Sequence, residues 1–384
     1  RTEKFRAKFL LETVHQLKEE LEKLNIPLFV YYGNSANYLP SLIEKHTIDS
    51  IFLQREWTRD EKVILDNVKK KVPSGVKFNE VYDQFLYHPD DIPFNDFKSI
   101  PDIFTNFRKK CEVNSNIRPI IQVSSKMPVS NLIDTETKIP TLKELGFTNF
   151  YIHVNTAFPF KGGEAEAIKR IQNYFWETKK LGFYKKTRNG LIGVDYSSKL
   201  SAWLANGSIS PRIIYWEVKK FESDIIKNQD TYWLIFELIW RDYFKYVSLK
   251  HHDAIFKLGG ILNGTYNTKI NEKDKHNWIN GLTKEPFVNA NMKELLETGW
   301  MSNRGRQNVA SFWSKELNQD WRIGAAYFES MLIDYDVHSN WGNWMYASGV
   351  GNDPRNRKFN IKSQAERYDP AGKYQRMWLQ ESLF

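Results

Sequence analysis

The beginning of the chain alternates helical patterns with short apolar runs. Residues 5–24 repeat apolar side chains at helical spacing, which predicts an amphipathic helix. The segments after it alternate in the order strand 27–32, helix 38–45, strand 50–53, helix 58–71 and strand 76–81. Such alternation is typical of a parallel, Rossmann-like sheet in an α/β domain. Because these domains normally open on a strand, we expect the first strand or strands to be missing from this chain.

The alternation stops near residue 118. Three prolines then fall among Ser, Thr, Asn and Asp residues, which is typical of a linker. Helical spacing dominates the rest of the chain, without strand alternation after about residue 200; its clearest stretches are 200–206, 212–221, 231–248, 288–298 and 321–333. The sequence therefore predicts an α/β domain at 1–118, a linker at 119–155 and an all-α domain at 156–384.

The composition adds an aromatic surplus and a basic charge. The 384 residues are enough for two or three domains, and they include 13 Trp, 19 Tyr and 25 Phe. These rings indicate either a large core or stacking on planar ligands. The formal net charge of +9 favours a polyanionic partner through long-range attraction.

Cys111 is the only cysteine. It excludes an intramolecular disulfide framework and a cysteine-based zinc site, and it fits a reducing compartment. The longest apolar stretch, 233–240, contains Glu237 and is too short to span a bilayer. We therefore expect a cytoplasmic monomer that has no membrane partner.

Hydroxyl groups cluster before a predicted helix at 195–201. Serine hydroxyls and free backbone N–H groups at a helix start suit a phosphate. Helix capping is the commoner role of such serines. The residues alone leave both interpretations open.

Glu237 and Arg241 stand four residues apart on the predicted helix 231–248. At this spacing, the simplest interpretation is an ion pair on the helix surface. Aromatic neighbours would instead raise the pKa of the Glu237 carboxyl group and let it donate a hydrogen bond. These neighbours are Trp233, Phe236, Trp240 and Phe244.

Two more polar segments follow further along the chain. Residues 298–308 bring two arginines and several amides to a turn or helix start, which suits an anion or an amide but equally a solvated turn. Asp334 and Asp336 come just before two tryptophans. Only His338 adds a ligand type nearby, so we expect no metal site. The two carboxylates can instead accept hydrogen bonds from an imide, a ribose or an arginine. Motifs of P-loop, dinucleotide-binding, zincin and α/β-hydrolase proteins are absent.

These segments, in this order after an α/β domain, resemble the photolyase/cryptochrome family. Four longer stretches are similar to its DASH subgroup in particular: 85–94, 100–109, 186–191 and 301–308. The resemblance implies an α/β antenna domain followed by an all-helical domain that binds FAD. It also implies an antenna pigment, for which the folate 5,10-methenyltetrahydrofolate near Glu56 is one candidate.

The resemblance assigns roles to individual residues. Those matching FAD-contacting positions are Tyr184, Ser197, Ser198, Lys199, Leu200, Ser201, Asn303, Arg306, Asp334, Asp336 and Asn340. Catalytic roles fall on Asn340, which would face flavin N5, and on Glu237, which would contact a thymine dimer. Expected DNA contacts are Arg188, Glu237, Trp240, Arg241, Tyr243, Asn303, Arg304 and Gln364.

The implied activity is that of a deoxyribodipyrimidine photo-lyase. Excited reduced FAD would split cyclobutane pyrimidine dimers, preferentially in single-stranded DNA, where flipping the dimer out of the stack costs least. Arginines would hold phosphates and aromatic rings would stack on bases. The (6-4) branch carries paired histidines where this chain has Ser302 and Asn303, which argues against (6-4) repair.

The chain departs from the family at its tryptophan wire. Trp344 and Trp321 match the proximal and middle positions, whereas the distal position falls on Thr268. Tyr266 or Trp278 could take the place of this distal residue. Lys284-Glu285-Pro286 is a second departure, because the family usually has Gly-x-Pro there. A blue-light receptor that signals through a partner and an inactive flavin- or nucleic-acid-binding protein remain as alternatives.

Overall fold

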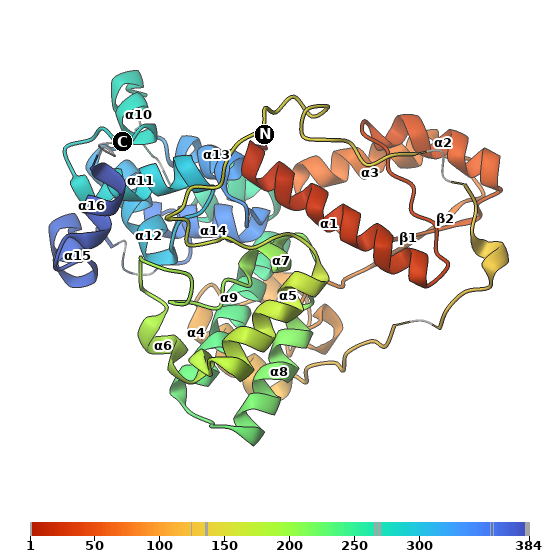
Figure 1. Ribbon diagram of the computed structural model, residues 1–384, viewed down its shortest axis with the longest axis horizontal. Coiled ribbons are helices and arrows are strands. Elements are labelled where there is room, and N and C mark those ends of the chain that lie inside the picture. Colours follow the sequence, from red (N-terminus) through yellow and green to blue (C-terminus); the bar gives the residue numbers. More distant parts are fainter. Residues whose placement is uncertain are drawn as a thin grey trace.

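The computed structural model describes residues 2–123, 125–134, 137–264, 266, 270–353, 355 and 357–380. Its N-terminal part contains a small parallel sheet flanked by helices (Figure 1). Strands β1 and β2 pair in parallel, with Ser50 opposite Lys77. The elements of this part are α1 (Lys4–Lys23), α2 (Ser35–His46), β1 (Ser50–Gln54), α3 (Arg59–Lys71), β2 (Lys77–Val81) and α4 (Phe104–Asn114).

The prediction of a strand at 27–32 is wrong. This segment has no strand conformation, and the backbone N–H of Val30 donates to the hydroxyl of Thr137 at 3.1 Å instead of to a strand. An apolar run becomes a strand only when a neighbour pairs with it. The other two predicted strands and the helices around them are confirmed to within a few residues.

The rest of the chain is helical, as predicted, and no strand occurs after residue 200 among the described residues. The predicted linker region has little regular structure, and its Met127 N–H donates to the carbonyl of Leu24 at the end of α1. The helices are α5 (Glu164–Ile171), α6 (Tyr184–Thr187), α7 (Ser201–Ala205), α8 (Pro211–Asp224), α9 (Gln229–His251), α10 (Glu272–Ile279), α11 (Pro286–Thr298), α12 (Asn303–Ser311), α13 (Trp321–Met331), α14 (Val337–Ser348), α15 (Ile361–Tyr368) and α16 (Lys373–Leu379).

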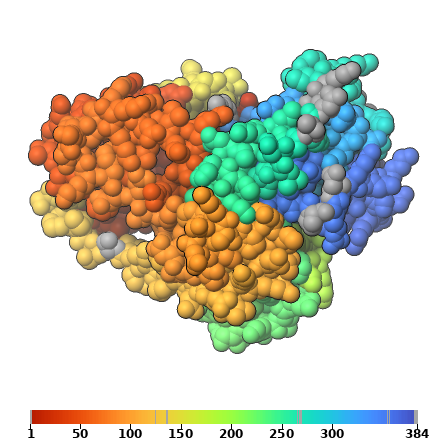
Figure 2. Space-filling view, turned by 180° about the vertical axis from the view of Figure 1, so that it is seen from behind, coloured from red at the N-terminus to blue at the C-terminus, as the bar shows by residue number. Residues whose placement is uncertain are grey.

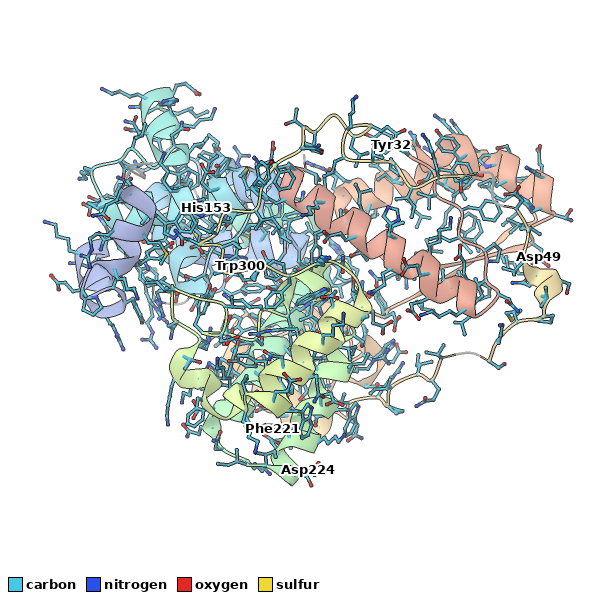
Figure 3. All side chains as sticks on the ribbon, in the orientation of Figure 1. Tyr32, Asp49, His153, Phe221, Asp224 and Trp300 are labelled. Carbon is cyan, nitrogen blue, oxygen red and sulfur yellow. The ribbon has the colours of Figure 1, made fainter. Side chains whose placement is uncertain are left out.

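The helical part buries many of its large aromatic residues. The side chains of Trp203, Trp278, Trp313 and Trp321 are fully buried. Trp300, labelled near the centre of the molecule in Figure 3, stacks on Phe158 at 4.6 Å between ring centroids. None of the helices described here is both long and apolar enough to cross a membrane.

Helix α4 and the segment before it lie against the helical part. Figure 2 shows this orange surface pressed on the green and blue-green surface. The ring of Phe104 in α4 stacks on Trp240 in α9 at 3.7 Å. The buried carboxylate of Asp242, also in α9, accepts hydrogen bonds from the backbone N–H groups of Leu86 and Tyr87 at 2.9 and 2.8 Å. The loop ahead of α4 is thus fixed by α9.

Candidate functional site

A cavity of about 440 Å³ lies between α9, α12 and α14. Its volume is in the usual range for a small-molecule or cofactor site. It brings together residues that are far apart in the sequence, and most of the predicted site residues lie on its wall: Arg188, Glu237, Trp240, Arg241, Asn303, Arg304, Arg306, Asp334, Asp336, Asn340 and Trp344.

The acidic pair of the cavity is held by two cations. Arg306 donates to both oxygens of Asp334, at 2.8 and 3.0 Å, and the hydroxyl of Ser201 donates to the same carboxylate at 2.7 Å. Asp336 caps α14 by accepting from the N–H of Ser339, and its other oxygen lies 3.1 Å from the ammonium of Lys245. Burial opposes ionisation of Asp336, but Lys245, His338 and Arg241 together outweigh it and hold the pKa of this carboxyl group far below its usual range.

Asn340 lies one turn into α14, with its side chain at the cavity. Its amide nitrogen donates to the carbonyl of Ala325 in α13 at 3.0 Å. This bond fixes the orientation of the amide and leaves its oxygen for a group in the cavity.

Helices α13 and α14 approach each other closely at Gly324. A Cβ at this position would lie 2.2 Å from the ring of Trp344, so the approach requires glycine.

Glu237 pairs with Arg188, not with Arg241. The carboxylate of Glu237 lies 2.7 Å from the guanidinium of Arg188 at the C-terminal end of α6. Burial raises the pKa of Glu237, while Arg188 opposes this shift. Arg241 donates to the carbonyls of Gln84 and Leu204. The simple ion pair predicted from the i,i+4 spacing is therefore wrong.

The 195–201 segment does not line the cavity, and Ser201 is linked to it by the hydrogen bond to Asp334. Lys199 has a left-handed backbone, with φ +64°, and a side chain that is 2% exposed. Its ammonium lies 3.1 Å from the ring centroid of Tyr196 and 4.9 Å from that of Trp300, without a hydrogen-bond partner. Burial lowers its pKa. Tyr184, another predicted FAD contact, is buried in the core nearby.

The remaining predicted DNA contacts have mixed outcomes. Tyr243 is fully buried, and its hydroxyl donates to the carbonyl of Pro101. It is not available to stack on a base, because α4 covers this face of α9. Gln364 accepts from Arg304 at 3.4 Å, and the guanidinium of Arg304 lies over the ring of Tyr368. Arg304 and Gln364 therefore belong to one polar cluster.

The predicted tryptophan wire is not a simple row of touching rings. The ring centroid of Trp344 lies 5.1 Å from that of Phe328 and 6.1 Å from that of Trp278. The ring centroid of Trp321 lies 5.7 Å from that of Trp341. Among the described residues, no ring contact joins Trp344 to Trp321. Tyr266 donates to the carbonyls of Ser314 and Ser348. Thr268, the predicted distal position, lies outside the described residues.

Sequence reasoning missed Lys245 and Tyr335. Lys245 follows Arg241 by four residues on α9, so the helical spacing already placed it on the cavity side of that helix. Tyr335 lies between the two aspartates. A second cavity, of about 330 Å³, shares three lining residues with the first: Arg241, Tyr335 and Asp336.

Comparison with known proteins places these residues in a family context. A family model described as the FAD binding domain of DNA photolyase matches residues 233–382, and one described as DNA photolyase matches residues 1–125. Cryptochrome DASH of Danio rerio is 45% identical over 388 residues, which cover 99% of this chain and 74% of the relative. Cryptochrome DASH of Gloeobacter violaceus is 44% identical and covers 99% of this chain and 76% of the relative.

Solved structures agree with these matches. A cryptochrome of Synechocystis sp. superposes with a TM-score of 0.93 at 43% identity, covering 98% of this chain and 78% of the other. A class III photolyase of Agrobacterium tumefaciens superposes with a TM-score of 0.78 at 25% identity, covering 97% of this chain and 77% of the other.

Proposed function

The chain belongs to the photolyase/cryptochrome family, in its cryptochrome DASH branch, and from this premise we propose that it splits cyclobutane pyrimidine dimers in single-stranded DNA under blue light. The observation that supports this most is one cavity whose lining includes Glu237 and Arg188 together with Asp334, Asp336 and Asn340. A substrate and a cofactor can therefore meet inside it.

The residues of the cavity fit the flavin that the family's FAD-binding domain holds. Aromatic walls suit a planar ring, and Asn340, Arg306 and Asp334 present an amide, a cation and an anion to its polar edge. Bound FAD supplies the light-driven electron chemistry. We propose that Ser197–Ser201 lie along its phosphates, because Ser201 already links this segment to Asp334.

Glu237 and the nearby arginines would handle the DNA. Glu237 lines the cavity beside Arg188, so its carboxyl group can accept a hydrogen bond from a pyrimidine N–H or, when protonated, donate one to a pyrimidine carbonyl. Arg188 would orient this carboxyl group, and Arg304 at the cavity wall would attract phosphates. Trp240 exposes part of its ring to the cavity and would stack on a base. Single strands are favoured because no base pair has to open.

Illumination of the reduced holoprotein with an oligonucleotide that carries one thymine dimer tests this proposal. We expect thymine recovery in the single strand, slower recovery in the duplex and none in the dark. A protein that contains flavin but recovers no thymine under any of these conditions would overturn the repair function.

The same sample separates the alternative functions. The relatives' name, cryptochrome, favours photoreception as the second candidate. A photoreceptor would change its absorption in light without repairing the oligonucleotide. An inactive protein would lack flavin absorption after purification.

The second cavity is a candidate antenna site. It lies between the N-terminal part and the helical part, and its wall includes Gln54, Glu56 and His338. Glu56 is half-buried at this wall, and its carboxylate oxygens can accept hydrogen bonds from the N–H groups of a pterin. We propose that a folate such as 5,10-methenyltetrahydrofolate binds here. Reconstitution with that folate should add a near-ultraviolet band, and Glu56→Ala should remove the band but keep the flavin spectrum.

A further inference from the structure

The first turn of α1 meets the last turn of α13. In Figure 1 the N-terminal end of the chain lies directly beside α13. The backbone N–H of Glu3 donates to the carbonyl of Ser330 at 3.0 Å. Arg6 donates to the carbonyls of Glu329 and Leu332 at 2.6 and 3.1 Å. Carbonyls at a helix end have no partner within the helix, so α1 satisfies the end of α13 from outside.

Arg6 is buried in this junction, with an exposed fraction of 8%. Its guanidinium also lies 5.0 Å from the ring centroid of Tyr335. One side chain therefore contacts the end of α13 and the middle of the loop 332–336, which carries Asp334 and Asp336 into the cavity. Within this loop the N–H of Tyr335 donates to the carbonyl of Leu332, and the N–H of Ile333 ties the loop to the carbonyl of Gly299.

Helix α1 has little freedom to shift relative to this loop. Phe5 packs on Gly299, where an added Cβ would lie 2.7 Å from the Cβ of Phe5. A Cβ on Gly162 would lie 2.1 Å from the carbonyl of Phe9, so α1 is also fixed on another side. The guanidinium of Arg6 is thus held on a rigid helix.

We propose that Arg6 is a positioning residue for the flavin pocket: it fixes the loop 332–336 so that Asp334 and Asp336 face the cavity. Its Nη1 donates to both carbonyls, and its Nη2 donates to the hydroxyl of Thr2 at 2.9 Å. A lysine has one terminal nitrogen and cannot make all of these bonds while it also lies against the ring of Tyr335. Arg6 does not line the cavity and acts only through the loop. The part of the proposal that concerns flavin rests on the proposed function, whereas the ordering of the loop does not.

Hydrogen exchange of the flavin-free protein tests the ordering. In Arg6→Met we expect the amides of Ile333 and Tyr335 to exchange about tenfold faster or more, because charged hydrogen bonds to the loop are lost. Amides of α9 should be unchanged. Arg6→Lys should recover only part of the protection. Lys18→Met, which removes a cation from the exposed side of the same helix, is the control and should not affect the loop.

FAD titration and the flavin midpoint potential provide the second readout. Arg6→Met should weaken FAD binding about tenfold and shift the potential, while Lys18→Met should do neither. If Arg6→Met accelerates exchange by the same factor throughout the chain, Arg6 has a merely structural role and the proposal is overturned. Unchanged exchange in the loop would also overturn it. If the unmodified protein binds no FAD, the proposed function fails, but the exchange result still decides the role of Arg6.

Discussion

The sheet of the N-terminal part and the helical part bury their apolar side chains very differently. On β1, Phe52 is 78% exposed, and on α3 Val63 and Ile64 are each 53% exposed. In the helical part, large rings such as Trp313 are completely buried. The cavity lies in the second environment. Precise placement of a cofactor thus coincides with dense packing, because locked rotamers keep polar groups in position.

The sharpest test of this contrast removes one ring from each part. Trp313→Ala should lower the free energy of unfolding by about 3–5 kcal/mol, because it leaves a large cavity in a packed core. Phe52→Ala should lower it by less than about 0.5 kcal/mol, as expected for an exposed site. Denaturant unfolding measures both. Comparable losses would show that the sheet is as tightly packed as the helices.

A second test separates the two parts at the contact between α9 and the loop ahead of α4. Asp242→Ala should cost about 3 kcal/mol, because two buried N–H groups lose their acceptor. Asp242→Asn keeps an acceptor oxygen and should cost much less. Limited proteolysis should cut the Ala variant first near Leu86. If cleavage near Leu86 is equal in both variants, Asp242 does not hold this loop.

A third test uses pH within the helical part. Burial raises the pKa of Glu294 to about 7 from an ordinary value of 4.5, although Tyr374 and Lys199 oppose the shift. The folded protein therefore holds this proton more tightly than the unfolded chain. Its contribution to stability is complete below about pH 4.5 and is lost as the pH rises through about 7.

Glu294→Gln should remove this dependence. The wild-type protein should lose about 3 kcal/mol more than the variant between pH 4.5 and 8, measured by urea unfolding. Gln keeps an oxygen to accept from the hydroxyl of Tyr374, which lies 2.6 Å from Glu294. Parallel pH profiles of the two proteins would mean that folding does not shift the pKa of Glu294.

The smallest expected effect is local to the cavity. Glu237→Gln should slow dimer splitting about tenfold through loss of one strong hydrogen bond, with unchanged flavin absorption and unfolding temperature. Glu272→Gln, on the exposed surface of α10, is the matched control and should repair at the normal rate. A large loss of stability in Glu237→Gln would indicate that Glu237 mainly stabilises the fold. This result would contradict a role for Glu237 in the cavity.

The sequence predicted elements well where their signal is local. The helix of residues 5–24 and the strand 50–53 follow from spacing alone. The prediction of a strand at 27–32 was wrong because a strand needs a partner strand. The apolar sequence of this segment does not show whether such a partner exists. The prediction that Tyr243 contacts DNA was wrong for a related reason. The periodicity of α9 does not reveal that α4 covers one of its faces.

The candidate site was harder to predict from the residues alone. Glu237 and Arg241 looked like partners because they are near in sequence, but Arg188 comes from another helix. The resemblance to the family supplied most of the cavity residues, and it did so without their geometry. The role proposed for Arg6 has no sequence signal, because its contacts lie more than 300 positions away.

Arg241, Tyr335 and Asp336 form a wall that two cavities share. A ligand that shifts this wall from one side changes the free energy of binding on the other. Thermodynamic linkage makes such coupling reciprocal. If a bound pigment strengthens the binding of the flavin, the bound flavin must strengthen the binding of the pigment by the same factor. The two chromophores would then be interdependent in assembly as well as in the transfer of light energy, and the order in which they are loaded would alter the rates of assembly but not the final state.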